Sequence, residues 1–474
     1  MRSASTRGWR SARWDLPAAG SSTALPPLVS AGRARRARGD KPAAVDGAPG
    51  HAVAFTDWPW KGVEWSLSFV GLLVYFFAVT SYRIPVAQEA IILACIGLVA
   101  DKHARVRFPA MMAFFAIYLL VAAVGYKGTE FSSVTWEPLL GHVKLFLITM
   151  ATLAVLTTRA RIRFFTFWYL ACFAFFPVRG GLFNYFIYGA TEQGRVAWNQ
   201  IFSNPNDFSM LLLFPFALAM GLLGLEKKKW IRIACLGAIT VLPLLIFLSQ
   251  SRGTIIALAV GGLVVLLTAK RGRARAFLGI AAASIVLAIF APNSVWVRLG
   301  ALQGAVGSGN LKEAEDSGSA EQRAEIWKVA WGVGKSHPVL GVGLGGYPTA
   351  HQWQASKGGR YKGMARGFRD AHNTYLRVLA ETGLLGLLAF LACIVAAWSY
   401  VRRARLASAD QGRARSLFFA EVSLLATAIC GLFGSYDDIS FLYLQLALMW
   451  ATATQIMSET AAANRQAAAG QVAR

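Results

Sequence analysis

His372 is the candidate catalytic base, because it stands at the junction of a polar and an apolar segment. It stands in the run Asp-Ala-His-Asn-Thr-Tyr at 370–375, where a long polar segment gives way to a long apolar one. An imidazole titrates near neutral pH, so His372 is suited to take a proton from a hydroxyl group. A lone histidine in a loop is also often an ordinary polar residue, and its position alone leaves both interpretations open.

Four arginines are candidates for binding an anion. Arg252 separates two apolar runs, and Arg179 lies inside one. A cation so close to hydrocarbon is costly unless it faces protein, water or an anion, although Arg252 could instead snorkel to a lipid phosphate. Arg323 on a surface helix and Arg195 in a loop could equally be solvated charges. Guanidinium groups stay charged and present forked donors, which suits a pyrophosphate.

The sequence gives no sign of a metal or nucleotide site. It has no HExxH, D-x-D or P-loop pattern, and the glycines at 341–346 follow no strand that would make them a dinucleotide loop. The five cysteines all lie in apolar runs and are expected to be buried apolar residues rather than ligands or disulfides. Asp437 and Asp438 form a short acidic turn that is either a topology feature or a contact for a sugar. We therefore expect no cofactor.

Composition predicts an all-α polytopic membrane protein. Of the 474 residues 55% are hydrophobic and 15% are charged, against about 25% charged in soluble proteins. Apolar runs of about 20 residues are long enough to cross a bilayer as helices. The predicted spans are 63–82, 84–100, 108–125, 138–157, 164–187, 207–224, 231–248, 254–269, 276–292, 375–400, 416–434 and 440–457.

Charge in the connecting loops predicts the orientation. The formal net charge is +24, which in a soluble protein would suggest nucleic acid as a partner. Here, however, Lys and Arg gather in the N-terminal tail and in every second short loop, while the loops between hold at most one each. This alternation places both termini in the cytoplasm and the sparse loops outside. The long segment 293–374 falls outside as well.

The long segment 293–374 is predicted to be functional, because connections of that length in a compact protein typically are. Within it we expect a flexible flap at 303–319, an amphipathic surface helix over 321–333 lying against the membrane, and a glycine-rich turn after Pro338. The whole chain is predicted to have five parts. They are a disordered basic cytoplasmic tail at 1–56, helices at 57–292, the large periplasmic loop at 293–374, helices at 375–457 and a cytoplasmic tail at 458–474.

Several short motifs occur together in one order. They are Ser251-Arg252-Gly253, Arg323 with Ile326-Trp327, Pro338 followed by Gly341-Val-Gly343-Leu-Gly345, His372-Asn373-Thr-Tyr375, and Glu381-Thr-Gly383-Leu-Leu-Gly386. In this order the chain resembles the O-antigen ligase family of bacterial inner-membrane glycosyltransferases. The resemblance covers about 60–455 in layout and is most specific over 249–390. Each motif is weak alone.

The resemblance implies a GT-C-like fold and a specific reaction. A glycan would pass from undecaprenyl pyrophosphate to lipid A–core oligosaccharide at the periplasmic face, without metal or nucleotide, as a step of lipopolysaccharide biosynthesis. Arg252 and Arg323 would bind the pyrophosphate, and His372 would activate the acceptor hydroxyl. Arg179 and Arg195 match the family less securely. We expect a monomer acting on membrane-held substrates, with no nucleic acid partner.

Three other functions are compatible with the same apolar spans and cationic residues. O-antigen polymerases and protein O-oligosaccharyltransferases share the donor type but have other acceptors. The chain shows no additional soluble domain for a polypeptide acceptor and no second large arginine-rich external loop. A lipid-linked glycan transporter without catalysis could also have twelve spans and cationic cavities. Such a transporter would not need His372.

Overall fold

The computed structural model describes residues 55–268, 274, 278, 319–357 and 367–472, which are helical apart from loops and two isolated bridges. The predicted tail at 1–56, except its last two residues, lies outside them. So do the predicted span at 276–292, except Leu278, and the predicted flap at 303–319, except Ser319.

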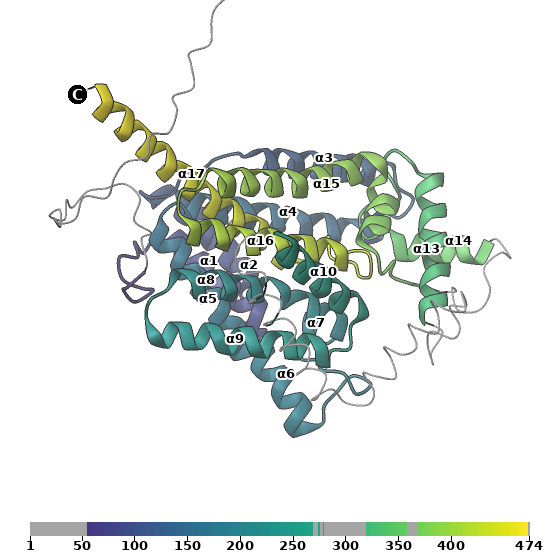
Figure 1. Cartoon of the computed structure of the whole chain (residues 1–474). Coiled ribbons are helices and arrows are strands. Elements are labelled where there is room, and N and C mark those ends of the chain that lie inside the picture. Colours follow the sequence, from purple (N-terminus) through teal and green to yellow (C-terminus); the bar gives the residue numbers. More distant parts are fainter. Residues whose placement is uncertain (1–54, 269–273, 275–277, 279–318, 358–366, 473–474) are drawn as a thin grey trace, which may run out of the picture. The chain divides into compact units, whose positions relative to one another are not determined.

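The described helices correspond to the predicted spans, except the span at 276–292 (Figure 1). Two π-helical turns, Ala174–Val178 and Asn184–Tyr188, continue α5 and α6 as one rod. The helices are α1 Leu67–Ser81, α2 Ala87–Ala100, α3 Ala110–Gly128, α4 Ser132–Val155, α5 Arg159–Phe173, α6 Arg179–Phe183, α7 Pro205–Leu211, α8 Leu213–Leu225, α9 Lys229–Leu248, α10 Arg252–Thr268, α13 Ser319–Ser336, α14 Tyr347–Lys357, α15 Thr374–Ala407, α16 Gln411–Cys430 and α17 Ser440–Val472.

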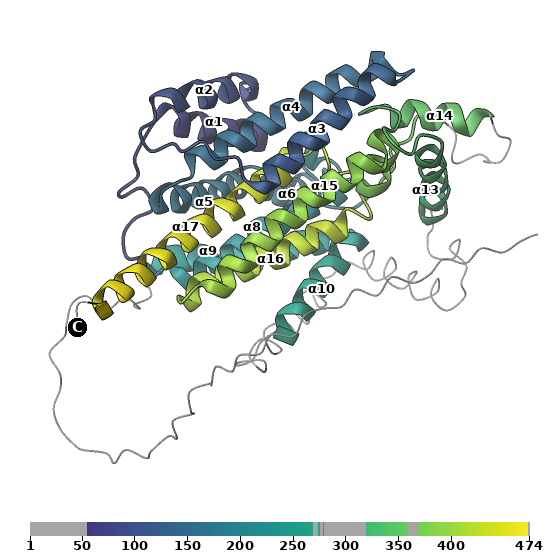
Figure 2. The ribbon, with the colours of Figure 1, turned by 90° about the horizontal axis from the view of Figure 1, so that it is seen from above.

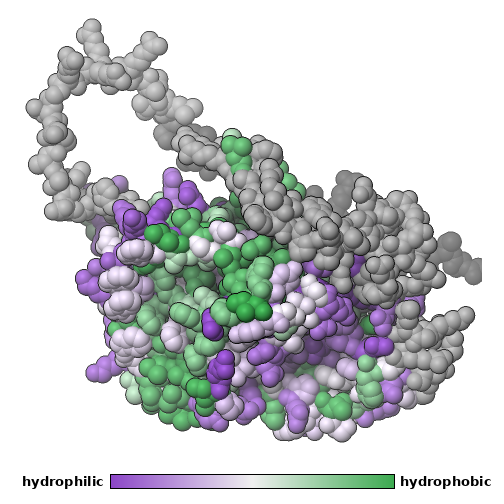
Figure 3. Space-filling view, turned by 90° about the horizontal axis from the view of Figure 1, so that it is seen from below, coloured by the Kyte–Doolittle hydropathy of each residue, from purple (hydrophilic) through white to green (hydrophobic). Residues whose placement is uncertain are grey.

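The protein is a polytopic membrane protein. Six stretches among the described residues are long and apolar enough to span a bilayer, and α1, α2 and α10 are shorter apolar helices. The six are Ala110–Gly128, Ser132–Val155, Arg159–Tyr188, Pro205–Leu225, Lys229–Leu248 and Thr374–Ala407. Large apolar side chains such as Ile96, Leu120 and Val124 face outward, and Figure 3 shows broad hydrophobic areas bordered by hydrophilic residues. The number of twelve spans and their orientation stay predictions.

The long helices pack side by side around α15 (Figure 2). This helix contacts α3, α16 and α17, while α17 also packs on α4, and α1 pairs with α2. Aromatic rings fill the space between the helices, with Phe76, Phe173 and Phe202 all packed against Phe441 of α17. The start of α17 is thereby held by several neighbours.

The amphipathic helix predicted over 321–333 is present as α13. Its apolar residues Ile326, Val329 and Val333 are buried in a small cluster of their own, which also contains Tyr347 of α14. Figures 1 and 2 show α13 and α14 beyond the beginning of α15. The apolar face of α13 is therefore covered by protein, since it packs on α14 and α15.

The predicted glycine-rich turn is inserted into a kink of α15. Gly383 interrupts that helix with φ 66° and ψ −169°. The turn meets the interruption backbone to backbone, because Leu384 N–H donates to Pro338 O at 2.8 Å and Gly343 N–H donates to Glu381 O at 2.8 Å. A Cβ at Gly383 would lie 2.3 Å from the Val339 carbonyl. Only glycine fits this contact.

Replacing Gly383 with alanine tests this contact. Gly383→Ala combines a steric clash with an unfavourable positive φ, and we expect it to lower the free energy of unfolding by about 2 kcal/mol or more. Thermal unfolding of the detergent-solubilised protein measures the effect. Gly141→Ala in α4 is the control, because a Cβ there meets nothing within 4 Å and should be neutral or slightly stabilising. Equal stability of the two variants would contradict the proposed close contact.

Candidate functional site

His372 is held in a strained backbone conformation at the start of α15. Its φ is +47°, in the left-handed region that non-glycine residues rarely adopt. The next residue, Asn373, caps the helix by accepting hydrogen bonds from the N–H groups of Tyr375 and Leu376, both at 3.0 Å. Such strain persists only where the surroundings impose it, and it gathers at functional sites.

Asp370 orients the imidazole of His372. One carboxylate oxygen of Asp370 accepts hydrogen bonds from the His372 N–H at 3.1 Å and from the Ser435 hydroxyl at 2.8 Å. The same oxygen lies 3.4 Å from His372 Nδ1. A proton on Nδ1 faces this carboxylate, which leaves Nε2 as the basic nitrogen. The His372 side chain is 41% exposed, so a substrate can reach it.

The loop that carries Ser435 is fastened to α15 by Arg377. The Arg377 guanidinium lies 2.9 Å from Asp438, 3.7 Å from Asp437 and 3.4 Å from Glu381. The side chains of Asp437 and Glu381 are fully buried, so their charges depend on this cation. The acidic turn seen in the sequence thus serves as a counter-charge for Arg377.

Arg323 extends into the same region from α13. Trp327, one helical turn later, donates from Nε1 to Ala371 O at 3.0 Å, which fixes α13 beside His372. Burial lowers the pKa of Arg323, and the nearby Tyr436 and Asp207 partly offset that shift. Asp207 of α7 also shares a hydrogen bond with the Tyr436 side chain. The site therefore combines one cation and two carboxylates from distant parts of the chain.

Arg195 lies in the loop before α7, and Arg252 lies at the start of α10. Arg195 donates to Ser249 O at 2.7 Å and to Asn206 Oδ1 at 2.8 Å, so it braces the segment before Arg252 against the residue preceding Asp207. Arg252 is the first residue of α10 and is half-buried. The start of α10 also meets α7, since the hydroxyls of Ser209 and Thr254 are 2.8 Å apart.

Arg179 is placed differently from the other predicted residues. It is exposed on α6, and its guanidinium lies over the ring of Phe183, 4.7 Å from the centroid. Within the described residues no hydrogen bond or ion pair links Arg179 to His372 or Arg323. Its role in binding pyrophosphate stays a prediction.

Asp370 and Asp207 were missed as candidates by sequence reasoning. Asp370 is two residues from His372, a spacing that suits a carboxylate and an imidazole on one loop, so a signal was available. Asp207 ends the run Ser-Asn-Pro-Asn-Asp at 203–207, which reads as the start of a helix. Nothing in that run indicates that it meets Tyr436.

The electrostatic surroundings keep His372 in its basic form. Burial lowers the pKa of the imidazole below its usual value, and the positive charges of Arg323 and Arg369 lower it further, while Asp370 raises it. The net direction is downward, so neutral imidazole predominates at neutral pH. No group of three or more His, Cys, Asp or Glu able to hold a metal ion occurs in the described parts of the chain.

Comparison with protein families identifies the region that contains this site. Residues 236–391 match a family model described as O-antigen ligase. This region is similar to O-antigen ligase domains. The matched family is one of lipid-linked glycan transferases, which include O-antigen ligases and polymerases. The matched region contains Arg252, Arg323 and His372, whereas Arg195 and Asp207 precede it. A search of curated proteins found no match.

The charge pattern around His372 gives a titration prediction. Asp370→Asn removes the group that stabilises imidazolium and should lower the pKa of His372, whereas Arg323→Gln removes a repulsive cation and should raise it. NMR of ring-labelled histidine, assigned with His372→Gln, measures both shifts. Asp57→Asn, far along the chain and paired with Lys61, should leave the titration unchanged. A higher pKa in Asp370→Asn would contradict the assigned pairing.

Proposed function

We propose that this protein is an O-antigen ligase. It transfers a glycan from undecaprenyl pyrophosphate to lipid A–core oligosaccharide in lipopolysaccharide biosynthesis. The observation that carries the proposal is the Asp370–His372 pair beside Arg323, at the polar end of an apolar helix bundle and within the matched domain. A lipid-held donor needs both an apolar surface for its tail and a polar site for its headgroup.

The proposed reaction is one base-assisted displacement. Nε2 of His372 takes the proton from an acceptor hydroxyl while that oxygen attacks the anomeric carbon of the donor sugar. The bond from the anomeric carbon to the pyrophosphate oxygen breaks, and its electron pair leaves with undecaprenyl pyrophosphate. Attack opposite the leaving group inverts the anomeric configuration. The products are glycosylated lipid A–core and the free lipid pyrophosphate.

Arg323 and Arg252 stabilise the leaving group in this proposal. Negative charge grows on the pyrophosphate as the bond breaks, and preorganised cations in a site shielded from water stabilise it most. Arg323 is held by the attachment of α13 at Ala371. Arg195 donates hydrogen bonds to Ser249, just before Arg252 in the chain, and to Asn206. We therefore assign it the role of positioning Arg252. No metal or nucleotide takes part.

The proposed location follows from the distribution of loop charges. The protein is a multi-pass component of the bacterial inner membrane with both termini in the cytoplasm and the His372 site at the periplasmic face. The donor tail stays in the bilayer, and the acceptor core approaches from the aqueous side. The protein works as a monomer.

A transfer assay tests the function and distinguishes acceptors. Purified protein is given undecaprenyl-pyrophosphate-linked glycan and lipid A–core in the presence of a chelator. Wild type should form glycosylated lipid A–core, and His372→Asn should lower the rate by at least about 100-fold, because asparagine tolerates a positive φ but is not a base.

Gel-filtration and thermal unfolding profiles of His372→Asn should match wild type. His337→Asn is the matched control, since this residue lies at the end of α13 and should retain activity. Growth of the donor chain or glycosylation of peptide instead would move the assignment to a polymerase or a protein glycosyltransferase. Full transfer activity of His372→Asn would contradict the assignment of His372 as the catalytic base, whereas no transfer by wild type to any of these acceptors would favour a transporter.

A further inference from the structure

A polar cavity lies between the α2–α3 connection, the end of α4 and α17. Its volume is about 320 Å³. Lys102, His103, Arg105 and Arg107 line it together with hydroxyl and apolar side chains, and none of the described residues lining it carries a carboxylate. We call it the basic pocket. Its charges are of one sign, which makes it suited to an anion.

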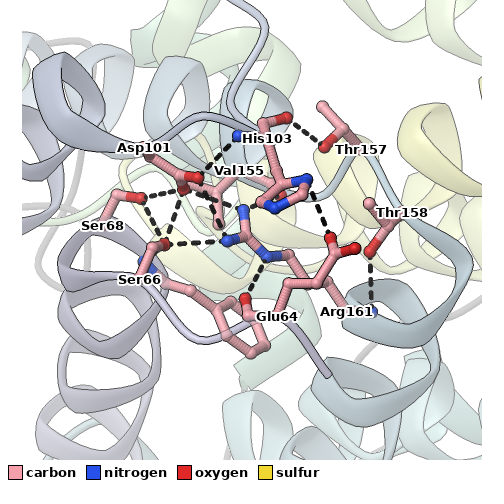
Figure 4. Close-up of polar contacts among 10 residues, drawn as sticks. Glu64, Ser66, Ser68, Asp101, His103, Val155, Thr157, Thr158 and Arg161 are labelled. Carbon is pink, nitrogen blue, oxygen red and sulfur yellow. Dashed lines mark hydrogen bonds and ion pairs between the residues drawn. The ribbon is translucent and has the colours of Figure 1, made fainter. Parts of the chain in front are cut away.

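Asp101, the carboxylate that precedes Lys102 in the chain, is already engaged elsewhere. Asp101 accepts hydrogen bonds from Arg161 at 2.8 Å, from Ser66 at 2.6 Å and from Ser68 at 2.5 Å (Figure 4). Burial raises the pKa of Asp101, but these bonds outweigh burial and hold it well below the usual value. Asp101 is therefore ionised, and its charge is matched by the buried Arg161.

Three basic residues of the pocket, Lys102, Arg105 and Arg107, have no counter-charge among the described residues, whereas His103 has one. Glu64 pairs with His103 at 3.0 Å. No ion pair joins Lys102, Arg105 or Arg107 to a described residue, and all three side chains are exposed. Three neighbouring cations repel one another, and a bound anion would relieve that repulsion.

The pocket is rigid because its backbone is fixed at several points. His103 N–H donates to Asp101 Oδ1 at 3.0 Å, and the Thr157 hydroxyl donates to His103 O at 2.6 Å, as Figure 4 shows. Arg105 N–H donates to Ala154 O at 2.9 Å. These bonds join the α2–α3 connection to the end of α4. A preorganised pocket loses little entropy when it binds a ligand.

Apolar residues alternate with the cations and indicate what kind of anion fits. Val106 is 69% exposed and Phe108 is 57% exposed; they neighbour Arg105 and Arg107 in the chain but lie outside the lining of the pocket. At the end of α2, Val99 is 93% exposed. Cations next to exposed apolar side chains are typical of the boundary between headgroups and hydrocarbon. An anion with acyl chains satisfies both kinds of residue.

The basic pocket is distant from the His372 site. The glycine-rich turn packs at Thr135, near the start of α4, whereas the basic pocket includes Leu153 near its end. Leu153 lies eighteen positions after Thr135, which corresponds to about 27 Å of helix, close to the thickness of a bilayer core. The two sites therefore serve opposite leaflets if α4 crosses the membrane.

We propose that the basic pocket binds the headgroup of an anionic glycerophospholipid. Lys102, Arg105 and Arg107 contact the phosphate, and Val106 and Phe108 contact the acyl chains. Basic pockets between membrane helices bind anionic headgroups in this manner. The site is independent of the transfer reaction. By the predicted orientation it faces the cytoplasmic leaflet.

Lipid retention in native mass spectrometry tests this assignment. Delipidated full-length protein is mixed with phosphatidylglycerol or with phosphatidylcholine of the same acyl chains. Wild type should retain one phosphatidylglycerol at least about tenfold more strongly than phosphatidylcholine. Arg105→Gln/Arg107→Gln should lose this preference. The double variant should still fold, because both side chains are exposed and unpaired among described residues.

The control keeps the net charge of that variant but changes a different loop. Lys227→Gln/Lys229→Gln removes two exposed cations, one in the α8–α9 connection and one at the start of α9, on the same predicted face but outside the pocket. This variant should retain the lipid. Retention by the pocket variant equal to wild type would overturn the proposal, as would equal loss in the control. Displacement of the lipid by millimolar inorganic phosphate would show a phosphate site and likewise overturn it.

Discussion

The architecture around His372 depends on keeping Arg377 paired. The largely buried guanidinium at the start of α15 is tolerated only with counter-charges, and it takes them from its own helix and from the loop between α16 and α17. This pairing fixes the loop whose Ser435 meets Asp370 and whose Tyr436 meets Asp207. The residues that carry the proposed chemistry are positioned as a consequence of that pairing.

The same constraint acts at the other end of the bundle. Arg161 donates hydrogen bonds to Asp101, Ser66 and the backbone, and Arg163 forms a bidentate pair with Glu226 at 2.7 and 2.8 Å. Removing one partner of such a buried pair typically costs about 3–5 kcal/mol. Because these carboxylates are occupied, the remaining cations of the α2–α3 connection face outward. Structural pairing at one end thus leaves a surface able to bind an anion.

Much of the fold could be predicted from local sequence. Apolar runs long enough to cross a membrane gave the positions of the helices, and the periodicity of 321–333 gave α13. The kink in α15 could not be predicted, because Gly383 departs from helical geometry only through contact with the turn after Pro338. The π-helical turns between α5 and α6 also lack a clear local signal.

The candidate site was predictable only in part. His372 and Arg323 have sequence contexts that suggest chemistry, and α13 brings them together through Trp327. The partners Asp207 and Tyr436 are more than 220 residues apart in the chain, so their contact depends on how α7 meets the loop before α17. For Arg179 the intramembrane sequence context still carries the predicted role, since the structure shows only that it is exposed and stacks on Phe183.

The most direct test of the account is a structure of the protein with a donor analogue that resists transfer, determined by cryo-electron microscopy in a lipid nanodisc. The account predicts the pyrophosphate within hydrogen-bonding distance of Arg323 and Arg252, with the anomeric carbon facing His372 Nε2. A pyrophosphate bound elsewhere, for example in the basic pocket, with the His372 site empty, would contradict it.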